Sequence, residues 1–254
     1  MNSTVAAAPG LRSEGQTFYV WMAASFVLVA FGGFTPTYWA KIATGTFQGP
    51  PIMHVHGMLM FTWTLFYFAQ TALVATRRTP DHRASGLAGI ALFSVMMCSI
   101  FVGQMAILKR ADTLGMGDAA RRFSAVALCA WPLAAGLFTL AIVNIRRPEV
   151  HKRYMVLMMS ALMTPAIARV FLTLLSSPGD ATGPPPPWVS VPPALIADLF
   201  IVVAIVRDWR ILGRPHPVYL YGGLVVIAQQ VLTVPFAATA TWMSIAKAFE
   251  SLAG

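Results

Sequence analysis

The sequence predicts an all-α polytopic membrane protein in which seven helices cross the bilayer and a short C-terminal helix lies on its surface. Hydrophobic residues make up 57% of the 254 positions and charged residues only 11%, so the chain has too little polar surface for a soluble domain. Apolar runs of about 20 residues, the length that spans a bilayer core, recur along the chain. The basic residues gather between these runs, as topology signals do.

The predicted transmembrane domain covers residues 17–236, and its seven apolar segments are 17–36, 52–75, 85–107, 123–145, 153–176, 191–208 and 217–236. Residues 1–16 are polar and rich in alanine and glycine. They have no compact charged stretch followed by a cleavage site, so we expect a loose N-terminal tail rather than a signal peptide. An odd number of spans places the two termini on opposite sides of the membrane.

Two segments on the far side of the membrane are predicted to lie at its surface. Residues 179–188, with the sequence Gly-Asp-Ala-Thr-Gly-Pro-Pro-Pro-Pro-Trp, cannot be helical and are expected to form a stiff connection with Trp188 at the interface. Residues 237–254 are expected to contain a short amphipathic helix that lies on the membrane. This segment carries an aromatic residue and two charged residues, Trp242, Lys247 and Glu250.

The distribution of basic residues predicts the orientation of the bundle. One side holds Arg12, Arg77, Arg78, Arg83, Arg146, Arg147, Lys152, Arg153, Arg207, Arg210 and Arg214. The opposite side holds a smaller set, namely Lys41, Lys109, Arg110, Arg121, Arg122 and Lys247. Because basic loops stay in the cytoplasm, we expect the N-terminus to be cytoplasmic and the C-terminus periplasmic.

Composition and motifs limit the possible functions. The net charge of +9 does not indicate nucleic-acid binding, because no stretch interleaves aromatic and basic residues as nucleic-acid modules do. Cys98 and Cys129 fall inside apolar segments and are expected to pack as small hydrophobic residues. The sequence has no phosphate-binding glycine loop, nucleophile elbow or HExxH motif. The predicted partners are the lipid bilayer and a small-molecule or anionic ligand, and no oligomeric state is indicated.

Three histidines stand just before helices on the predicted cytoplasmic side, so the chain is best described as one leading helix followed by three similar hairpins. They are His82 in Arg-Thr-Pro-Asp-His-Arg, His151 in Arg-Pro-Glu-Val-His-Lys-Arg and His216 in Arg-Pro-His-Pro. Zinc accepts imidazole nitrogens tetrahedrally, so three histidines at one depth could bind it together with a water. The favoured interpretation is that histidine, arginine and proline here start helices and reach lipid phosphates.

The second helix carries a stripe of functional side chains at the helical period: His56, Met60, Trp63, Tyr67 and Gln70. His54 points almost the other way, because two residues turn a helix by about 200°. The stripe offers His56 as a ligand and Met60 as a possible second ligand, and the rings of Trp63 and Tyr67 could form the walls of a cofactor pocket. This chemistry suits heme b or a copper ion. The alternatives are that His56 bonds a neighbouring helix, or that it contacts a proton or a substrate.

Other polar residues are predicted to lie at the depth of His56, namely Gln104, Arg169, Asp198 and Gln230. An unpaired charge at this depth is costly, so Arg169 and Asp198 are expected to pair directly or through Gln230 or water. Such a pair could serve only to fix the bundle. Alternatively, Arg169 could offer its guanidinium to a substrate carboxylate or a heme propionate in a pocket that His56 also lines.

Several motifs resemble those of an uncharacterised family of bacterial seven-helix integral membrane proteins. They are Pro36-Thr37-Tyr38-Trp39, His54-Val55-His56-Gly57, Gln70 to Val74, His82-Arg83 and His151-Lys152-Arg153. The resemblance implies the fold and a location in the bacterial inner membrane, and it implies no activity. Locally, His56-Gly57 followed by Met60 is similar to the second helix of heme-copper oxidase subunit I, which implies heme ligation at His56. The chain lacks the other intramembrane histidines of that family.

Three functions therefore remain as hypotheses. The first is heme b or metal binding through His56 in a redox role. The second is a transporter or proton-coupled permease that uses Arg169, Asp198 and His56, in which Gly222, Gly223 and Pro235 would mark a broken seventh helix. The third is a membrane enzyme or accessory subunit with zinc held by His82, His151 and His216.

Overall fold

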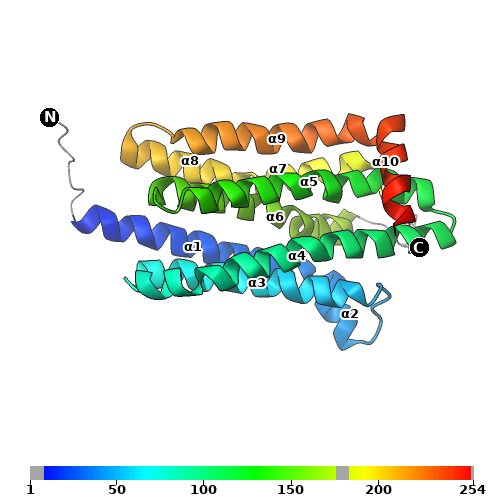
Figure 1. The fold of residues 1–254 in the computed structure, drawn as a ribbon, viewed down its shortest axis with the longest axis horizontal. Helices are drawn as coiled ribbons and strands as arrows, with labels where there is room; N and C mark the ends of the chain where they lie inside the picture. The colour runs from blue at the N-terminus through cyan, green and yellow to red at the C-terminus, as the bar shows by residue number, and fades with distance from the viewer. Residues whose placement is uncertain (1–8, 176–182, 253–254) are drawn as a thin grey trace.

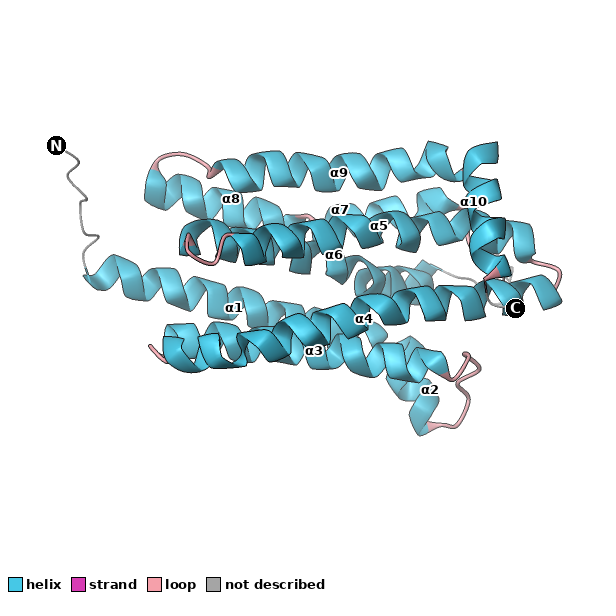
Figure 2. Ribbon diagram, in the orientation of Figure 1, coloured by secondary structure: helices cyan, strands magenta, loops and turns pink. Residues whose placement is uncertain are grey.

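The computed structural model describes residues 9–175 and 183–252, and its described part contains helices and loops but no strand (Figure 2). The helices are α1 (Pro9–Phe34), α2 (Ala40–Ala43), α3 (Ile52–Ala75), α4 (Thr79–Thr113), α5 (Gly117–Val143), α6 (Pro148–Leu175), α7 (Val191–Ala197), α8 (Leu199–Leu212), α9 (Pro217–Ala237) and α10 (Ala240–Ser251). A π-helix, η1 (Thr35–Trp39), joins α1 to α2, and a 3-10 turn, η2 (Pro187–Ser190), precedes α7.

Seven spans are long and apolar enough to cross a membrane within the described residues, which confirms the predicted seven-helix bundle: Thr17–Ala43, Ile52–Ala75, Thr79–Thr113, Gly117–Val143, Pro148–Leu175, Pro187–Leu212 and Pro217–Ala237. The spans lie side by side, and the start of α1 and helix α10 are at opposite ends of the bundle (Figure 1). We call the end formed by residues 76–78, 144–147 and 213–216 the basic end. The assignment of this end to the cytoplasm stays a prediction.

Several helices begin earlier than their apolar segments suggested, because a proline in the first turn accepts the helical φ angle and needs no hydrogen-bond partner. Pro148 opens α6, and Pro80 lies in the first turn of α4. Helix α1 is described from Pro9, so residues 9–16, which were expected to belong to a loose tail, are helical. Residues 1–8 lie outside the described part of the chain.

Helix α6 is the central helix of the bundle and packs against α1, α5, α7, α8 and α9. Its buried face is rich in methionine, with Met158, Met159 and Met163 almost wholly inaccessible. These residues serve packing, since methionine fills irregular gaps between helices. Helices α1 and α6 approach so closely that a Cβ atom on Gly33 would collide with the backbone carbonyl group of Ala166. Small residues permit such contacts between membrane helices.

Helix α10 lies across the ends of α4, α5 and α9 (Figure 1). The Thr239 hydroxyl caps its N-terminus by accepting a hydrogen bond from the Trp242 backbone N–H at 3.1 Å. Arg121 of α5 ties the helix down, since its guanidinium bonds Glu250 at 2.7 Å, Asp112 at 2.6 Å and Asp118 at 2.9 Å. The expected short C-terminal helix therefore forms. Of the predicted connection over 179–188, residues 179–182 lie outside the described part, and Trp188 is exposed in η2.

The contact at Gly33 predicts a local effect on stability. Gly33→Ala is expected to destabilise the protein by roughly 1–3 kcal/mol, because the added methyl group forces α1 away from α6. Gly32→Ala is the matched control, since a Cβ there meets no atom within 4 Å, and it should leave stability unchanged or slightly higher. Thermal unfolding of the purified variants in detergent measures both. Equal melting temperatures for the two variants would show that the helices can separate without cost.

Candidate functional site

The predicted stripe on α3 faces the interior of the bundle, but neighbouring side chains fill the space in front of it. The Trp63 ring lies 5.0 Å from the Phe93 ring and 5.7 Å from the Phe138 ring, measured between centroids. The Tyr67 ring lies 6.0 Å from the Phe26 ring. Trp63 and Tyr67 are therefore parts of the packed core, and the expectation that they form the walls of a cofactor pocket is not supported.

The ends of the stripe are bonded to α4. The Gln70 side-chain amide donates to the Ser85 hydroxyl at 2.6 Å, and His56 Nδ1 lies 2.8 Å from the Ser99 hydroxyl oxygen. Because the Ser99 hydroxyl donates its single hydrogen to the Met96 carbonyl oxygen, the Nδ1 atom of His56 must be the donor in its contact with Ser99. The Nε2 atom of the neutral ring is then unprotonated.

His54 differs from His56 in the way that the helical period predicts. It is exposed, and its Nδ1 atom lies 3.1 Å from the Tyr38 hydroxyl oxygen. His56 and Met60 are half-buried on the inner face of α3. Of the two histidines, His56 is therefore the one turned toward the bundle.

The expected ion pair between Arg169 and Asp198 does not form. The Arg169 guanidinium of α6 lies 5.8 Å from the centre of the Phe34 ring on α1. Asp198 turns toward α9 instead, where its Oδ1 atom accepts a hydrogen bond from Gln230 Nε2 at 3.1 Å. The two charged side chains therefore belong to different helix interfaces. Gln104 is half-buried on α4, which is a different helix from those that carry Arg169 and Asp198.

Asp198 lies at an interruption in the sixth span, between the last residue of α7 and the first residue of α8. Its carbonyl oxygen accepts from the backbone N–H groups of both Ile201 and Val202, so the helix tightens there but does not open. The residue is 5% exposed, and within residues 9–175 and 183–252 its Oδ2 atom has no hydrogen-bond partner. The Oε1 atom of Gln230 is likewise buried and without a donor from those residues.

The seventh span is continuous from Pro217 to Ala237, so the predicted break at Gly222, Gly223 and Pro235 is absent from this described helix. A Cβ atom on Gly222 would instead meet the Leu157 side chain, and one on Gly223 would lie 3.3 Å from Ile201. These glycines therefore serve close packing of α9 against α6 and α8.

A shallow hollow of about 470 Å³ lies between η2, α7 and α9. Its walls are apolar and contain none of the predicted site residues; they are formed by Trp188, Val191, Pro192, Val231, Val234 and Pro235. The polar groups expected in one shared cavity are therefore divided among three interfaces. His56 lies between α3 and α4, Arg169 faces α1, and Asp198 faces α9.

The three histidines of the basic end do not form a zinc site. No group of three or more histidine, cysteine, aspartate or glutamate side chains in the described ranges is arranged to hold a metal ion. The His82 and His151 rings lie 6.4 Å apart, and His151 Nδ1 lies 2.8 Å from the Ala141 carbonyl oxygen. His216 belongs to a different group of side chains, where its Nδ1 atom accepts from the Val218 backbone N–H at 3.2 Å.

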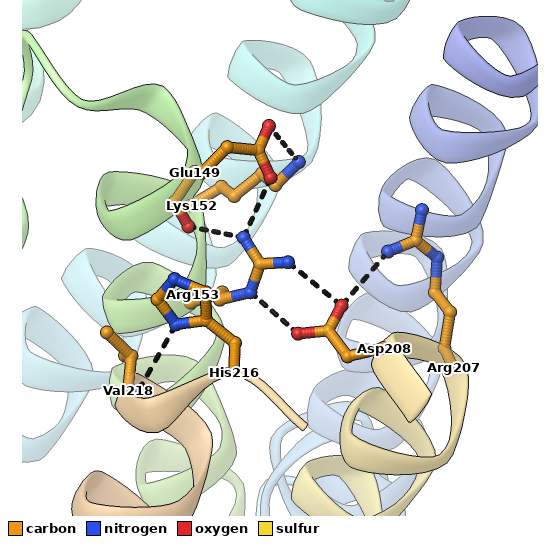
Figure 3. Close-up of polar contacts among 7 residues, drawn as sticks. All are labelled: Glu149, Lys152, Arg153, Arg207, Asp208, His216 and Val218. Carbon is orange, nitrogen blue, oxygen red and sulfur yellow. Dashed lines mark hydrogen bonds and ion pairs between the residues drawn. The ribbon is translucent and has the colours of Figure 1, made fainter. Parts of the chain in front are cut away.

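Beside His216 at the basic end lies an ionic network of the buried Arg153 and Asp208 with the exposed Glu149, and we call these three residues the ionic clamp (Figure 3). Arg153 of α6 and Asp208 of α8 form a two-pronged ion pair, with Nε to Oδ2 at 2.7 Å and Nη2 to Oδ1 at 2.9 Å. The remaining Nη1 atom donates to the carbonyl oxygen and a carboxylate oxygen of Glu149. Arg153 is 1% exposed and Asp208 is 0% exposed.

Aromatic rings and two more cations surround the clamp. The Tyr219 ring of α9 lies 5.8 Å from the Arg153 guanidinium. The Tyr19 ring of α1 is contacted by Lys152 at 4.8 Å and by Arg207 at 5.1 Å, each measured from the cation to the ring centre. Cations bind aromatic faces favourably when water is excluded. The clamp therefore connects four helices, α1, α6, α8 and α9, at one end of the bundle.

Burial lowers the pKa of the His216 imidazole, and the neighbouring positive charge of Arg153 lowers this pKa further. The ring therefore stays neutral near pH 7. A neutral ring keeps Nδ1 available as the acceptor for the Val218 N–H, which starts α9 directly beside the clamp.

The clamp was not predicted from the sequence, because Arg153 and Arg207 were interpreted as orientation signals and Asp208 had no assigned role. One signal was present. Arg153 and Asp208 are the first and last residues of two predicted apolar segments, 153–176 and 191–208, so both lie where a helix meets the membrane surface. Opposite charges at the same level of two helices can pair, but the sequence does not show which helices are neighbours.

Comparisons of the chain with protein-family models, with curated proteins and with solved structures find no match. The assignment of function therefore depends on the geometry of these residues. The resemblance to the bacterial seven-helix family stays a prediction.

Removing one charge of the clamp is expected to destabilise the protein more than removing both. Arg153→Met leaves the buried Asp208 carboxylate without its cation and is expected to cost about 3–5 kcal/mol of unfolding free energy. The double variant Arg153→Met, Asp208→Leu removes both charges and should recover most of that loss. Denaturant titration of the purified proteins measures these changes, with the exposed Arg210→Gln as the control. A single Arg153 variant as stable as the Arg210 variant would contradict the assigned role.

Proposed function

We propose that this integral membrane protein is a proton-coupled carrier in which Asp198 and Gln230 bind the proton. The supporting observation is the pair of buried oxygen atoms, Asp198 Oδ2 and Gln230 Oε1, that lack a hydrogen-bond donor among the described residues. Ionisable groups inside a membrane span are costly and usually functional. Of the three hypotheses from the sequence, the carrier hypothesis is the one that this pair favours.

A single proton satisfies both oxygen atoms. Gln230 already donates its amide N–H to Asp198 Oδ1. A proton bound to Asp198 Oδ2 turns the carboxylate into a neutral acid, whose O–H can donate to Gln230 Oε1, so that each group donates once and accepts once. When the proton leaves, two acceptors and a negative charge remain in a poorly solvated place. The proton therefore alters how α8 fits against α9.

The position of Asp198 supports a role in conformational change. Asp198 lies near the middle of the sixth span, Pro187–Leu212, at the tightened turn between α7 and α8, and carriers bind substrates and coupling ions near the middle of the membrane. The ionic clamp joins α6, α8 and α9 at the basic end. The sixth and seventh spans thus carry the proton-binding pair, and each also contributes contacts at the basic end.

The resemblance to the bacterial seven-helix family belongs to this proposal, together with an inner-membrane location and a cytoplasmic basic end. His56 is not needed for the proton-binding pair, because its contact to Ser99 lies between α3 and α4. The carrier therefore uses fewer of the predicted residues than the sequence suggested.

The proton-binding role of Asp198 is tested by transport. Purified protein is reconstituted into vesicles that contain a pH-sensitive dye, and gradients of small cations, amino acids and organic acids are imposed in turn. Wild type is expected to move protons with one of these solutes. Asp198→Asn should abolish the pH change because the amide cannot bind the proton. The control Asp81→Asn alters an exposed ion pair and should transport normally.

Infrared spectroscopy gives an independent readout of the same residue. A protonated carboxyl group inside the protein has its own C=O stretching band, which should be present in wild type and lost in Asp198→Asn. Wild-type vesicles that move no protons with any solute, or an Asp198→Asn protein that transports at the wild-type rate, would refute the proposed function.

A second candidate function is heme or metal binding through His56. It is favoured by one observation: the bond from His56 Nδ1 to Ser99 leaves the Nε2 lone pair free to coordinate. Ligand histidines usually have their other nitrogen fixed in this way. The predicted metals are the iron of heme b, copper or zinc.

An absorption spectrum and elemental analysis of protein purified from membranes test this second function. We expect a Soret band or a stoichiometric metal that disappears in His56→Ala and persists in His54→Ala, because His54 is exposed and bonded to Tyr38. Folded wild-type protein without colour or metal would end the hypothesis.

A further inference from the structure

Arg169 is a cation that has no counter-charge among the residues that the structure describes. It lies six residues before the end of the Pro148–Leu175 span, and its side chain is half-buried. None of the carboxylates in residues 17–175 and 183–252 pairs with it, although the cations Arg121, Lys152 and Arg153 each have one. The aromatic ring that its guanidinium contacts is that of Phe34, at 5.8 Å. A guanidinium held within a membrane span requires a compensating group.

Thr37 is an unsatisfied donor in the neighbouring helix. Most threonines in the described spans donate to the carbonyl oxygen of the preceding turn, as Thr35 does to Phe31 at 2.9 Å and Thr64 does to Met60 at 2.9 Å. The Thr37 hydroxyl oxygen is buried and has no such partner among the described residues. It lies in the π-helix η1, a form that occurs mostly as short insertions in helices, frequently at functional sites.

Thr37 and Arg169 lie at the same level of adjacent helices. Helices α1 and α6 run in the same direction and are in close contact at Gly33 and Ala166. Thr37 follows Gly33 by four residues, and Arg169 follows Ala166 by three, which is about one helical turn in each case. Each also lies six residues before the end of its own span. η1 itself packs against α6.

We propose that Arg169 and Thr37 form a binding site for an oxyanion between η1 and α6. A carboxylate or phosphate group would supply the negative charge that Arg169 lacks and an acceptor for the Thr37 hydroxyl. Guanidinium groups bind both kinds of oxyanion with two parallel hydrogen bonds. Lys41, on the exposed helix α2 one turn beyond Thr37, adds a positive charge on the side from which the anion would enter.

The ligand can come from either of two sources, a small organic acid or phosphate ion in solution, or the headgroup of a lipid. As a dissolved ligand it would be the cargo that moves with the proton, and this assignment of a role rests on the proposed carrier function. The binding site itself does not require transport. Binding and transport are therefore measured separately, so that the failure of one is distinguishable from the failure of the other.

Titration calorimetry of the purified protein in neutral detergent tests the site, with sodium benzoate, sodium acetate and inorganic phosphate as probes and sodium chloride at equal ionic strength as the reference. We expect one of the three oxyanions to bind wild type. Arg169→Gln should weaken this binding roughly ten- to a hundredfold, the effect of losing charge-assisted hydrogen bonds. Thr37→Val removes only the hydroxyl and should weaken it by a smaller factor, about fivefold.

A second arm identifies a lipid source. Wild type and Arg169→Gln are placed in phosphatidylcholine discs with and without phosphatidylglycerol, and their melting temperatures are compared. A stabilisation by phosphatidylglycerol that Arg169→Gln loses, with no calorimetric binding, supports the site and assigns it to a lipid phosphate. Arg147→Gln, an exposed change at the basic end, is the control and should behave as wild type in both arms.

The proposal is overturned if folded wild type binds none of the three dissolved oxyanions and gains no stability from phosphatidylglycerol. Binding that persists unchanged in both Arg169→Gln and Thr37→Val would overturn it equally, because the anion would then lie elsewhere. Thr37→Val keeps the test decisive if Arg169→Gln does not fold. Loss of binding in these variants together with normal proton binding at Asp198 would separate the oxyanion site from the proton site.

Discussion

A charge that leaves water for the interior of a helix bundle must be met by another charge or by hydrogen bonds, and the bundle depends on this constraint at its basic end. There, Arg153 uses every one of its three nitrogen atoms: two bond the Asp208 carboxylate and the third bonds Glu149. The pair joins the first turns of the central helix α6 to the last turns of α8. Burial makes the arrangement costly to break from one side only, so it fixes which helices are neighbours.

Elsewhere the same constraint is met less completely, and the differences separate structural residues from candidate functional ones. Arg121 is surrounded by three carboxylates and serves to hold α10. Asp198 has one amide donor and one oxygen atom without a partner, and Arg169 has only an aromatic ring, within the part of the chain that the structure describes. Buried polar groups that lack partners are rare in folded proteins. Asp198 and Arg169 are therefore the positions at which an external proton or anion would find unused bonding capacity.

Hydropathy and the helical period were enough to predict the seven spans and the C-terminal helix, because these features depend on local sequence. The helical period also predicted that His54 and His56 point in nearly opposite directions, and the structure adds that His56 is the one turned inward. The bond between Gln230 and Asp198 was one part of the expected bridge, but the other part, to Arg169, does not form, since similar depth does not make two side chains neighbours. Nor did they predict the clamp, because Arg153 and Asp208 are 55 residues apart in the chain. Which helices adjoin is a property of packing, set by contacts such as that of Gly33 with Ala166.

The attachment of α10 has a mechanical consequence for the whole bundle. The helix bridges α4, α5 and α9, and Trp242 adds a hydrogen bond from its indole nitrogen to the Arg121 carbonyl oxygen at 2.7 Å. Together with the carboxylates of Asp112 and Glu250 on Arg121, this bond works as a strap across three span ends. Any rocking of the bundle that preserves the strap must keep these ends of α4, α5 and α9 together.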